Sequence, residues 1–111
     1  MSLLKITTVD RFEDDVLSSS IPVLVDFHAS WCGPCKASVP ALEDAAREFE
    51  GEIAFVKVDI EQEPKLAETY GVRSVPTFIL IKNREEAERF MGQASRGKLA
   101  SVLEPYAGGS Q

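Results

Sequence analysis

The sequence predicts an α/β protein, with a largely parallel sheet between layers of helices and an antiparallel hairpin at one edge. Short apolar segments of strand type alternate along the chain with segments whose apolar residues recur at every third or fourth position. The final two strand segments, residues 77–82 and 86–91, follow each other closely enough to form a hairpin. Strands connected through helices are usually parallel, so only the hairpin is expected to introduce antiparallel pairing.

The N-terminal third is expected to contain a strand, a helix and a second strand. Residues 3–6 form a short apolar start, and Thr8 can cap the helix that comes next. The apolar side of this helix is formed by Phe12, Val16 and Leu17. Residues 21–27 are apolar apart from a single acid, Asp26, which predicts a buried strand.

The central part of the chain predicts a long helix, a strand and a short helix. The long helix covers about residues 35–49, and Pro40 inside it should produce a kink. Its buried face is formed by Val39, Leu42, Ala46 and Phe49. Residues 53–59 predict a second buried strand, after which Pro64 opens a short helix that runs through Tyr70.

The end of the chain predicts a final helix after the hairpin. Gly71 occupies the position of a C-terminal cap for the short helix. Ser95 then caps the last helix, and Pro105 marks its fraying end. The apolar face of this helix is formed by Leu99, Val102, Leu103 and Tyr106.

Length and charge restrict the classes of function. A chain of 111 residues is expected to form one domain over residues 1–107, with a flexible tail at 108–111. Its formal net charge of −6, without a basic run, argues against binding to nucleic acid or to an anionic membrane. No secretory signal is visible and no apolar run reaches membrane-spanning length, so a cytoplasmic location is expected.

The two cysteines, Cys32 and Cys35, fit redox chemistry better than structural cross-linking. A bond between them closes too short a loop to restrict the unfolded chain. They lie where a strand ends and a helix begins, so free backbone N–H groups and the helix dipole would stabilise a thiolate on Cys32. A structural zinc site needs four ligands, and the chain offers two Cys and one His, so no metal is expected.

Several segments resemble the thioredoxin family, in order and with family-like spacing from about residue 3 to residue 106. They are Val23-Leu24-Val25-Asp26-Phe27, Trp31-Cys32-Gly33-Pro34-Cys35-Lys36, Phe55-Val56-Lys57-Val58-Asp59, Tyr70-Gly71-Val72-Arg73-Ser74-Val75-Pro76-Thr77-Phe78 and Gly92. The resemblance implies the thioredoxin fold, in which a five-stranded mixed sheet is flanked by four α-helices. It also implies the reduction of protein disulfides.

The resemblance further implies roles for four residues. Cys32 would attack the substrate disulfide, and Cys35 would resolve the mixed disulfide by attacking Cys32. Asp26 matches a buried acid that exchanges the proton of Cys35, and burial in an apolar strand should independently raise its pKa. The alternative is that Asp26 lies on an exposed strand face. Lys57 matches a lysine near that acid, or is simply a solvated residue at a strand end.

The resemblance implies an apolar groove in which the backbone of a substrate docks. Pro76 would follow a cis peptide bond, which the sequence alone does not indicate. The alternative is an ordinary trans proline at the start of a strand. The implied substrate-binding residues are Trp31, Gly33, Pro34, Val75, Pro76 and Gly92.

Two places depart from the family pattern. Position 28 is commonly aromatic in the family, and here it is His28. Its side chain either fills the same space with a hydrogen bond to the backbone or places a titrating group near the two cysteines. The segment Asn83-Arg84-Glu85 lacks the usual glycine, which puts a two-residue hairpin turn in doubt.

The expected function is that of a cytoplasmic disulfide reductase that acts on client proteins and is kept reduced by a thioredoxin reductase. No cofactor is expected beyond the redox-active Cys32–Cys35 disulfide, and we expect a monomer. Two other functions use the same fold, namely an oxidant or isomerase and a binding module that stabilises a partner through the groove. A reduction potential would separate a reductase from an oxidant, and replacing both cysteines would separate catalysis from binding.

Overall fold

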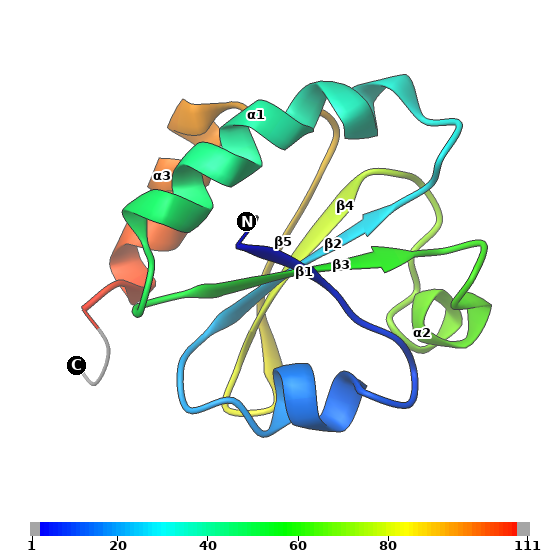
Figure 1. The fold of residues 1–111 in the computed structure, drawn as a ribbon, viewed down its shortest axis with the longest axis horizontal. Coiled ribbons are helices and arrows are strands. Elements are labelled where there is room, and N and C mark those ends of the chain that lie inside the picture. The colour runs from blue at the N-terminus through cyan, green and yellow to red at the C-terminus, as the bar shows by residue number, and fades with distance from the viewer. Residues whose placement is uncertain (1–2, 109–111) are drawn as a thin grey trace.

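The computed structural model describes residues 3–108 and places a five-stranded sheet at the centre of the fold (Figure 1). The strands are β1 (Leu4–Ile6), β2 (Val23–His28), β3 (Ala54–Asp59), β4 (Thr77–Lys82) and β5 (Glu85–Met91), in the spatial order β1-β3-β2-β4-β5. The helical segments are η1 (Glu13–Leu17), α1 (Gly33–Glu48), α2 (Pro64–Thr69), α3 (Arg96–Leu103) and η2 (Glu104–Tyr106). This is the mixed α/β arrangement that the resemblance implies.

The sheet contains more antiparallel pairing than the alternation of segments predicts. β3 runs parallel to β1 and β2, but β4 is antiparallel to both β2 and β5. The connection between β3 and β4, residues 60–76, contains the short helix α2. After it, β4 runs back alongside β2.

Helices cover both faces of the sheet (Figure 1). α1 and α3 pack on one face, in a cluster that includes Leu24 of β2, and η1 and α2 pack on the other, in a cluster that includes Val25 and Phe27. Successive side chains of a strand point to opposite faces. Asp26 and His28 therefore lie on the face of β2 that α1 covers.

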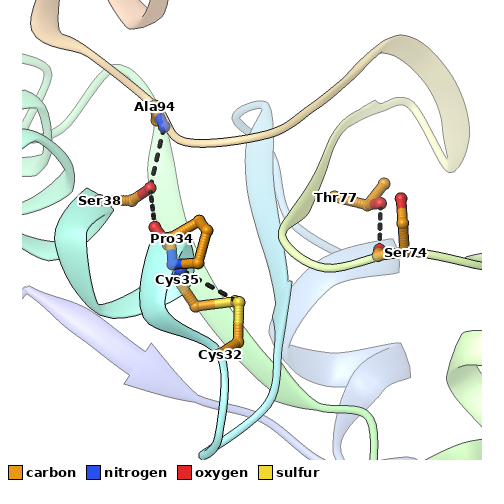
Figure 2. Close-up of a disulfide and its surroundings, with 7 residues drawn as sticks. All are labelled: Cys32, Pro34, Cys35, Ser38, Ser74, Thr77 and Ala94. Atoms are coloured by element: carbon orange, nitrogen blue, oxygen red, sulfur yellow. Dashed lines mark hydrogen bonds between the residues drawn. A yellow bond between two sulfur atoms is a disulfide. The ribbon is translucent and has the colours of Figure 1, made fainter.

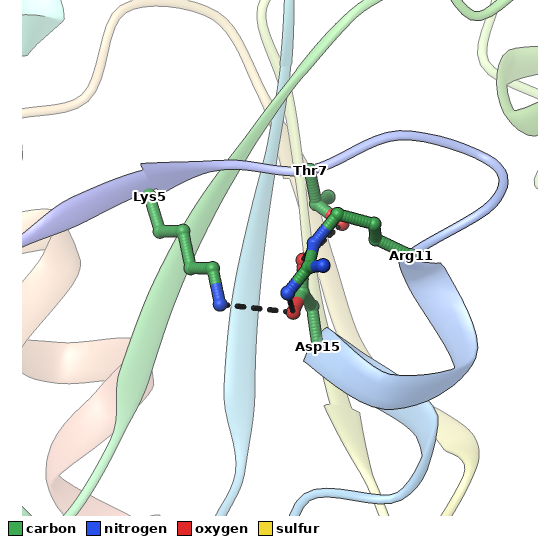
Figure 3. Close-up of polar contacts among 4 residues, drawn as sticks. All are labelled: Lys5, Thr7, Arg11 and Asp15. Carbon is green, nitrogen blue, oxygen red and sulfur yellow. Dashed lines mark hydrogen bonds and ion pairs between the residues drawn. The ribbon is translucent and has the colours of Figure 1, made fainter.

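The first helix begins later than the sequence predicts. Thr8 is not its cap, because the Thr8 carbonyl accepts the Arg11 N–H at 3.1 Å in a turn and η1 then forms a single π-helical turn. Asp15 organises this segment instead. Its side chain is 3% exposed and accepts hydrogen bonds of 2.8–3.3 Å from Lys5, Thr7 and Arg11 (Figure 3).

The later helices agree more closely with the expected ones. α1 begins at Gly33, two residues earlier than predicted, because Cys32 caps it and Pro34 fits a first turn whose N–H groups have no helical partner. The helix continues through Pro40, and the kink there stays a prediction. α2 begins at its proline, and the Ser95 side chain caps α3 as expected.

The missing glycine does not prevent a two-residue turn between β4 and β5. Asn83 and Arg84 both adopt positive φ angles, 53° and 70°, as a type I′ turn requires. The Arg84 guanidinium donates two hydrogen bonds of 2.8 Å to the Glu13 carboxylate, which joins the turn to η1. β5 accordingly starts at Glu85, one residue earlier than predicted.

None of the helices between residues 3 and 108 has the length and apolar character that a membrane crossing needs. The tail predicted at 108–111 lies outside the described residues from position 109 onward. The division into one domain and a tail therefore stays a prediction.

Candidate functional site

The candidate site is built where β2 ends and α1 begins. Cys32 immediately precedes the helix with an extended backbone, and it forms a disulfide with Cys35 in the first turn. The Cys32 Sγ also accepts the Cys35 backbone N–H at 3.1 Å (Figure 2). Free N–H groups and the helix dipole stabilise a sulfur anion at this position.

Both cysteines are largely enclosed by protein. Cys32 is 3% exposed and Cys35 is 6% exposed, and Val75 packs against the pair from the loop before β4. By contrast, the neighbouring Trp31 is 66% exposed. A partner would therefore meet Trp31 at the surface before it reached the sulfur atoms.

The loop before β4 holds two of the predicted docking residues. The Val75–Pro76 peptide bond is cis, as the resemblance implies. The Pro76 carbonyl accepts the Gly92 N–H at 3.0 Å, which joins this loop to the end of β5. The Thr77 hydroxyl donates to the Ser74 carbonyl at 2.7 Å and supports the loop (Figure 2). Gly92 has a φ of 93°, which residues with a side chain rarely adopt.

Ser38 connects the redox helix to the segment after β5, and the sequence analysis did not identify it. Its hydroxyl donates to the Pro34 carbonyl at 2.8 Å and accepts the Ala94 N–H at 2.9 Å (Figure 2). The side chain is completely buried. Its position was a usable signal, because Ser38 lies three residues after Cys35 and four before Leu42, on a buried helical stripe where a hydroxyl needs partners.

Met91 is a second residue that the sequence analysis missed. It is 63% exposed, directly precedes Gly92, and has its Sδ 3.5 Å from the Ser74 hydroxyl. An exposed methionine beside a predicted docking glycine is the signal that could have identified it. Exposed aromatic and methionine side chains such as Trp31 and Met91 are typical of surfaces that contact a partner protein.

Asp26 lies inside the sheet, not on an exposed strand face. It is 4% exposed, and its Oδ1 has no hydrogen-bond partner within residues 3–108. Burial raises the pKa of its carboxyl to about 7, against a smaller opposing effect of Lys57. A group with this pKa can accept a proton and return it near neutral pH.

Lys57 and His28 lie beside this acid and the cysteine pair. Lys57 is directly opposite Asp26 in the β2–β3 pair and is half-buried, so it is not simply a solvated strand-end residue. Lys57, His28 and Cys35 all line one cavity of about 90 Å³. Desolvation lowers the pKa of His28, Lys57 adds to this effect, and Asp59 opposes it. The imidazole is therefore neutral at neutral pH.

The arrangement offers a disulfide that can be reduced and re-formed, and a buried carboxyl whose pKa is near neutral. Lys57 connects the two, because it lines a cavity with Cys35 and lies opposite Asp26. Over the described range 3–108, no group of three or more His, Cys, Asp or Glu side chains could hold a metal ion. The substrate-binding residues predicted in two separate segments, at 75–76 and at 92, are brought together by the Pro76–Gly92 hydrogen bond.

Comparisons with known proteins agree with this geometry. The sequence model of the family described as Thioredoxin matches residues 3–105. The chain is 40% identical to a thioredoxin from Synechocystis sp. over 95 residues, which cover 86% of this chain and 89% of the relative. It is 38% identical to thioredoxin 1 from Nostoc sp. over 106 residues, which cover 96% and 99%. It is also 41% identical to the chloroplastic thioredoxin M5 of Oryza sativa subsp. japonica, over 86% of this chain and 56% of the relative.

Proposed function

Because the chain belongs to the thioredoxin family and is a thiol–disulfide oxidoreductase of the disulfide-reductase type, we propose that Cys32 attacks client disulfides and that Cys35 completes their reduction. The observation that carries this assignment is the position of Cys32 at the start of α1, where its sulfur accepts the Cys35 N–H. The same N–H would stabilise a Cys32 thiolate after the disulfide is reduced.

Reduction of a client proceeds through two exchanges. The Cys32 thiolate attacks one sulfur of the client disulfide, the client S–S bond breaks, and the second client sulfur leaves as a thiolate. Cys35 then loses its proton and attacks the Cys32 Sγ. The Cys32–client bond breaks, the first client sulfur also leaves as a thiolate, and the Cys32–Cys35 disulfide forms again. Two electrons pass to the client, and both client thiolates take protons from water.

Asp26 accepts the Cys35 proton in this proposal. Its burial and its pKa of about 7 support the role, because the carboxyl can be deprotonated when Cys35 reacts and protonated afterwards. Lys57, opposite Asp26 on β3, would stabilise the charged carboxylate.

Client backbone docks in the groove formed by the predicted binding residues. Exposure supports this part of the proposal for Trp31, Gly33, Pro34 and Gly92. The position of Val75 against the cysteine pair supports it for the loop that carries Pro76. Met91 belongs to the same surface through its contact with Ser74.

The proposal includes partners and a location. A thioredoxin reductase supplies the electrons, client proteins accept them, and the chain acts as a monomer. A cytoplasmic location is part of the proposal because a reductase needs a compartment that keeps thiols reduced. The rice relative is named as chloroplastic, so a plastid is the alternative that cell fractionation would test.

The reduction potential of the Cys32–Cys35 pair tests the direction of electron flow. The purified protein is equilibrated against glutathione and dithiothreitol buffers, and the expected reduction potential is about −270 mV. A reduction potential of about −120 mV would indicate an oxidant instead. Reduction of a protein disulfide should also disappear in Cys32→Ser, whereas a pure binding module would keep its partner in that variant.

A further inference from the structure

Met91 differs from the other sulfur-containing residues of the described chain in its access to solvent. Within residues 3–108 these residues are Cys32, Cys35 and Met91. The two cysteines are buried and bonded to each other, whereas Met91 is 63% exposed. An oxidant that arrives from solvent therefore meets the Met91 side chain before it meets the cysteine pair.

Contacts on both sides hold Met91 beside the loop that precedes β4. Its Sδ lies 3.5 Å from the Ser74 hydroxyl, and its backbone is paired with Thr77 across β4 and β5. The next residue, Gly92, donates its N–H to the Pro76 carbonyl at 3.0 Å. The thioether thus lies at the edge of the groove in which client backbone is proposed to dock.

We propose that Met91 is an oxidation site, at which hydrogen peroxide converts the thioether to a sulfoxide and thereby weakens the docking of client proteins. This inference rests on the proposed function, because it concerns the groove that receives the client. A methionine side chain is flexible and apolar, whereas its sulfoxide is polar. The sulfoxide oxygen binds water, and a client that docks over Met91 has to remove that water.

The oxidation balances with hydrogen peroxide as the oxidant. A lone pair of the Met91 Sδ attacks one peroxide oxygen, so that an S–O bond forms and the O–O bond breaks. The sulfur gives up two electrons, and the second oxygen leaves as hydroxide. This hydroxide takes the proton of the transferred oxygen and becomes water. The Cys32–Cys35 disulfide takes no part, because neither of its sulfur atoms is a thiol while the bond is intact.

Peroxide treatment of the disulfide form, followed by a kinetic assay, tests the proposal. The protein is incubated with hydrogen peroxide at pH 7, freed from peroxide, and analysed by peptide mass spectrometry for one added oxygen at Met91. It is then reduced with dithiothreitol and assayed on a protein disulfide and on a small-molecule disulfide. We expect kcat/KM to fall roughly fivefold or more for the protein disulfide. The rate with the small-molecule disulfide should stay the same, which also shows that the treated protein is folded.

Met91→Leu is the matched variant, because leucine keeps an apolar side chain without sulfur while Met1 stays in the chain. Whatever its own starting value, kcat/KM of this variant for the protein disulfide should be the same before and after peroxide. Met91→Gln places a polar amide at the same position. It should have a lowered kcat/KM for the protein disulfide without any peroxide.

Several results would overturn the oxidation site while leaving the proposed function intact. One is a Met91 that gains no oxygen under conditions that oxidise N-acetylmethionine in the same tube. Another is an oxidised Met91 with an unchanged kcat/KM, or a Met91→Gln variant as active as the untreated wild type. An equal fall in Met91→Leu, or with the small-molecule disulfide, would place the damage elsewhere in the protein. An untreated wild type that reduces no protein disulfide would contradict the proposed function itself.

Discussion

Asp15 and Asp26 are both buried carboxylates, and their surroundings affect them in opposite ways. The Asp15 side chain is 3% exposed, but hydrogen bonds from Lys5, Thr7 and Arg11 surround it (Figure 3). Burial by itself raises the pKa of Asp15, and these hydrogen bonds outweigh it and hold the pKa below the usual value. Asp26 is 4% exposed, and burial raises its pKa to about 7.

The supply of hydrogen-bond donors and the depth of burial separate the two acids, because Asp15 as a whole residue is only partly buried, whereas Asp26 is buried in the sheet. Asp15 lies between β1 and η1, where side-chain donors from a strand and a turn reach it. Asp26 lies on a central strand whose neighbours are β3 and β4, so the nearby backbone donors are already used in strand pairing. The first environment favours a structural anion, and the second favours an acid that can change its charge at neutral pH.

The largest expected effect comes from Asp26→Asn. Between pH 4 and pH 7 the folded protein holds a proton on Asp26 that the unfolded chain has released, so the free energy of unfolding falls as the pH rises. The shift corresponds to about 4 kcal/mol at most. Asp26→Asn should therefore be more stable than the wild type by up to about that amount above pH 8, and equally stable below pH 4. Urea unfolding of the oxidised proteins at both pH values checks this, and equal differences at the two values would contradict it.

Asp15→Asn should have the opposite sign and a smaller size. Its lowered pKa means that its contribution to stability is present above about pH 4 and is lost as the pH falls through the folded value. Lys5 and Arg11 are more than half exposed and add little, whereas Thr7 is 1% exposed. We expect a loss of about 1–2 kcal/mol at pH 7. Asp14→Asn, at the exposed neighbouring position, should leave the unfolding midpoint unchanged.

Ser38→Ala extends the comparison to a buried group without charge. It removes the partner of the buried Ala94 N–H and of the Pro34 carbonyl, at a cost of about 1 kcal/mol. Ser38 joins α1 to the segment after β5, which includes the proposed docking residue Gly92. We therefore expect kcat/KM of Ser38→Ala to fall for a protein disulfide, which docks there, but not for a small-molecule disulfide. Ser101→Ala, which removes an exposed hydroxyl on α3, is the control. Equal losses with both substrates would show that Ser38 contributes to stability alone.

The smallest effect is expected for Glu13→Gln, although hydrogen bonds from Arg84 and Ser18 lower the pKa of Glu13 to about 2. Both partners of this ion pair are more than half exposed, so water and salt compensate for its loss. Arg84→Gly should be more stable than Arg84→Ala, because glycine adopts a φ of 70° without strain. Thermal unfolding midpoints of the three variants test both statements. A larger loss of stability for Glu13→Gln than for Asp15→Asn would contradict the comparison, because burial would then not decide how much a carboxylate's contacts stabilise the fold.

The errors in the predicted fold share one cause. Thr8 has the local chemistry of a cap, but the turn is organised by Asp15 and its donors. The alternation of segments predicts a largely parallel sheet with antiparallel pairing in the hairpin, but β4 also pairs antiparallel with β2. The Asn83-Arg84 turn contains no glycine, yet both residues adopt positive φ angles. Glu13, which is distant in sequence, accepts a hydrogen bond from Arg84 of this turn. In each case a contact between segments distant in sequence outweighed a local preference.

The sequence by itself determined the positions of most helices and strands and the placement of Cys32 and Cys35 at a helix start, because hydrophobic periodicity and capping act over a few residues. Only the tertiary structure decided what surrounds those residues. Ser38 bonds to a backbone N–H 56 residues away, and His28 lines two cavities whose other lining residues come from separate elements. The physical reason is that desolvation, hydrogen-bond satisfaction and cavity shape depend on neighbours in space, which the order of residues along the chain does not list.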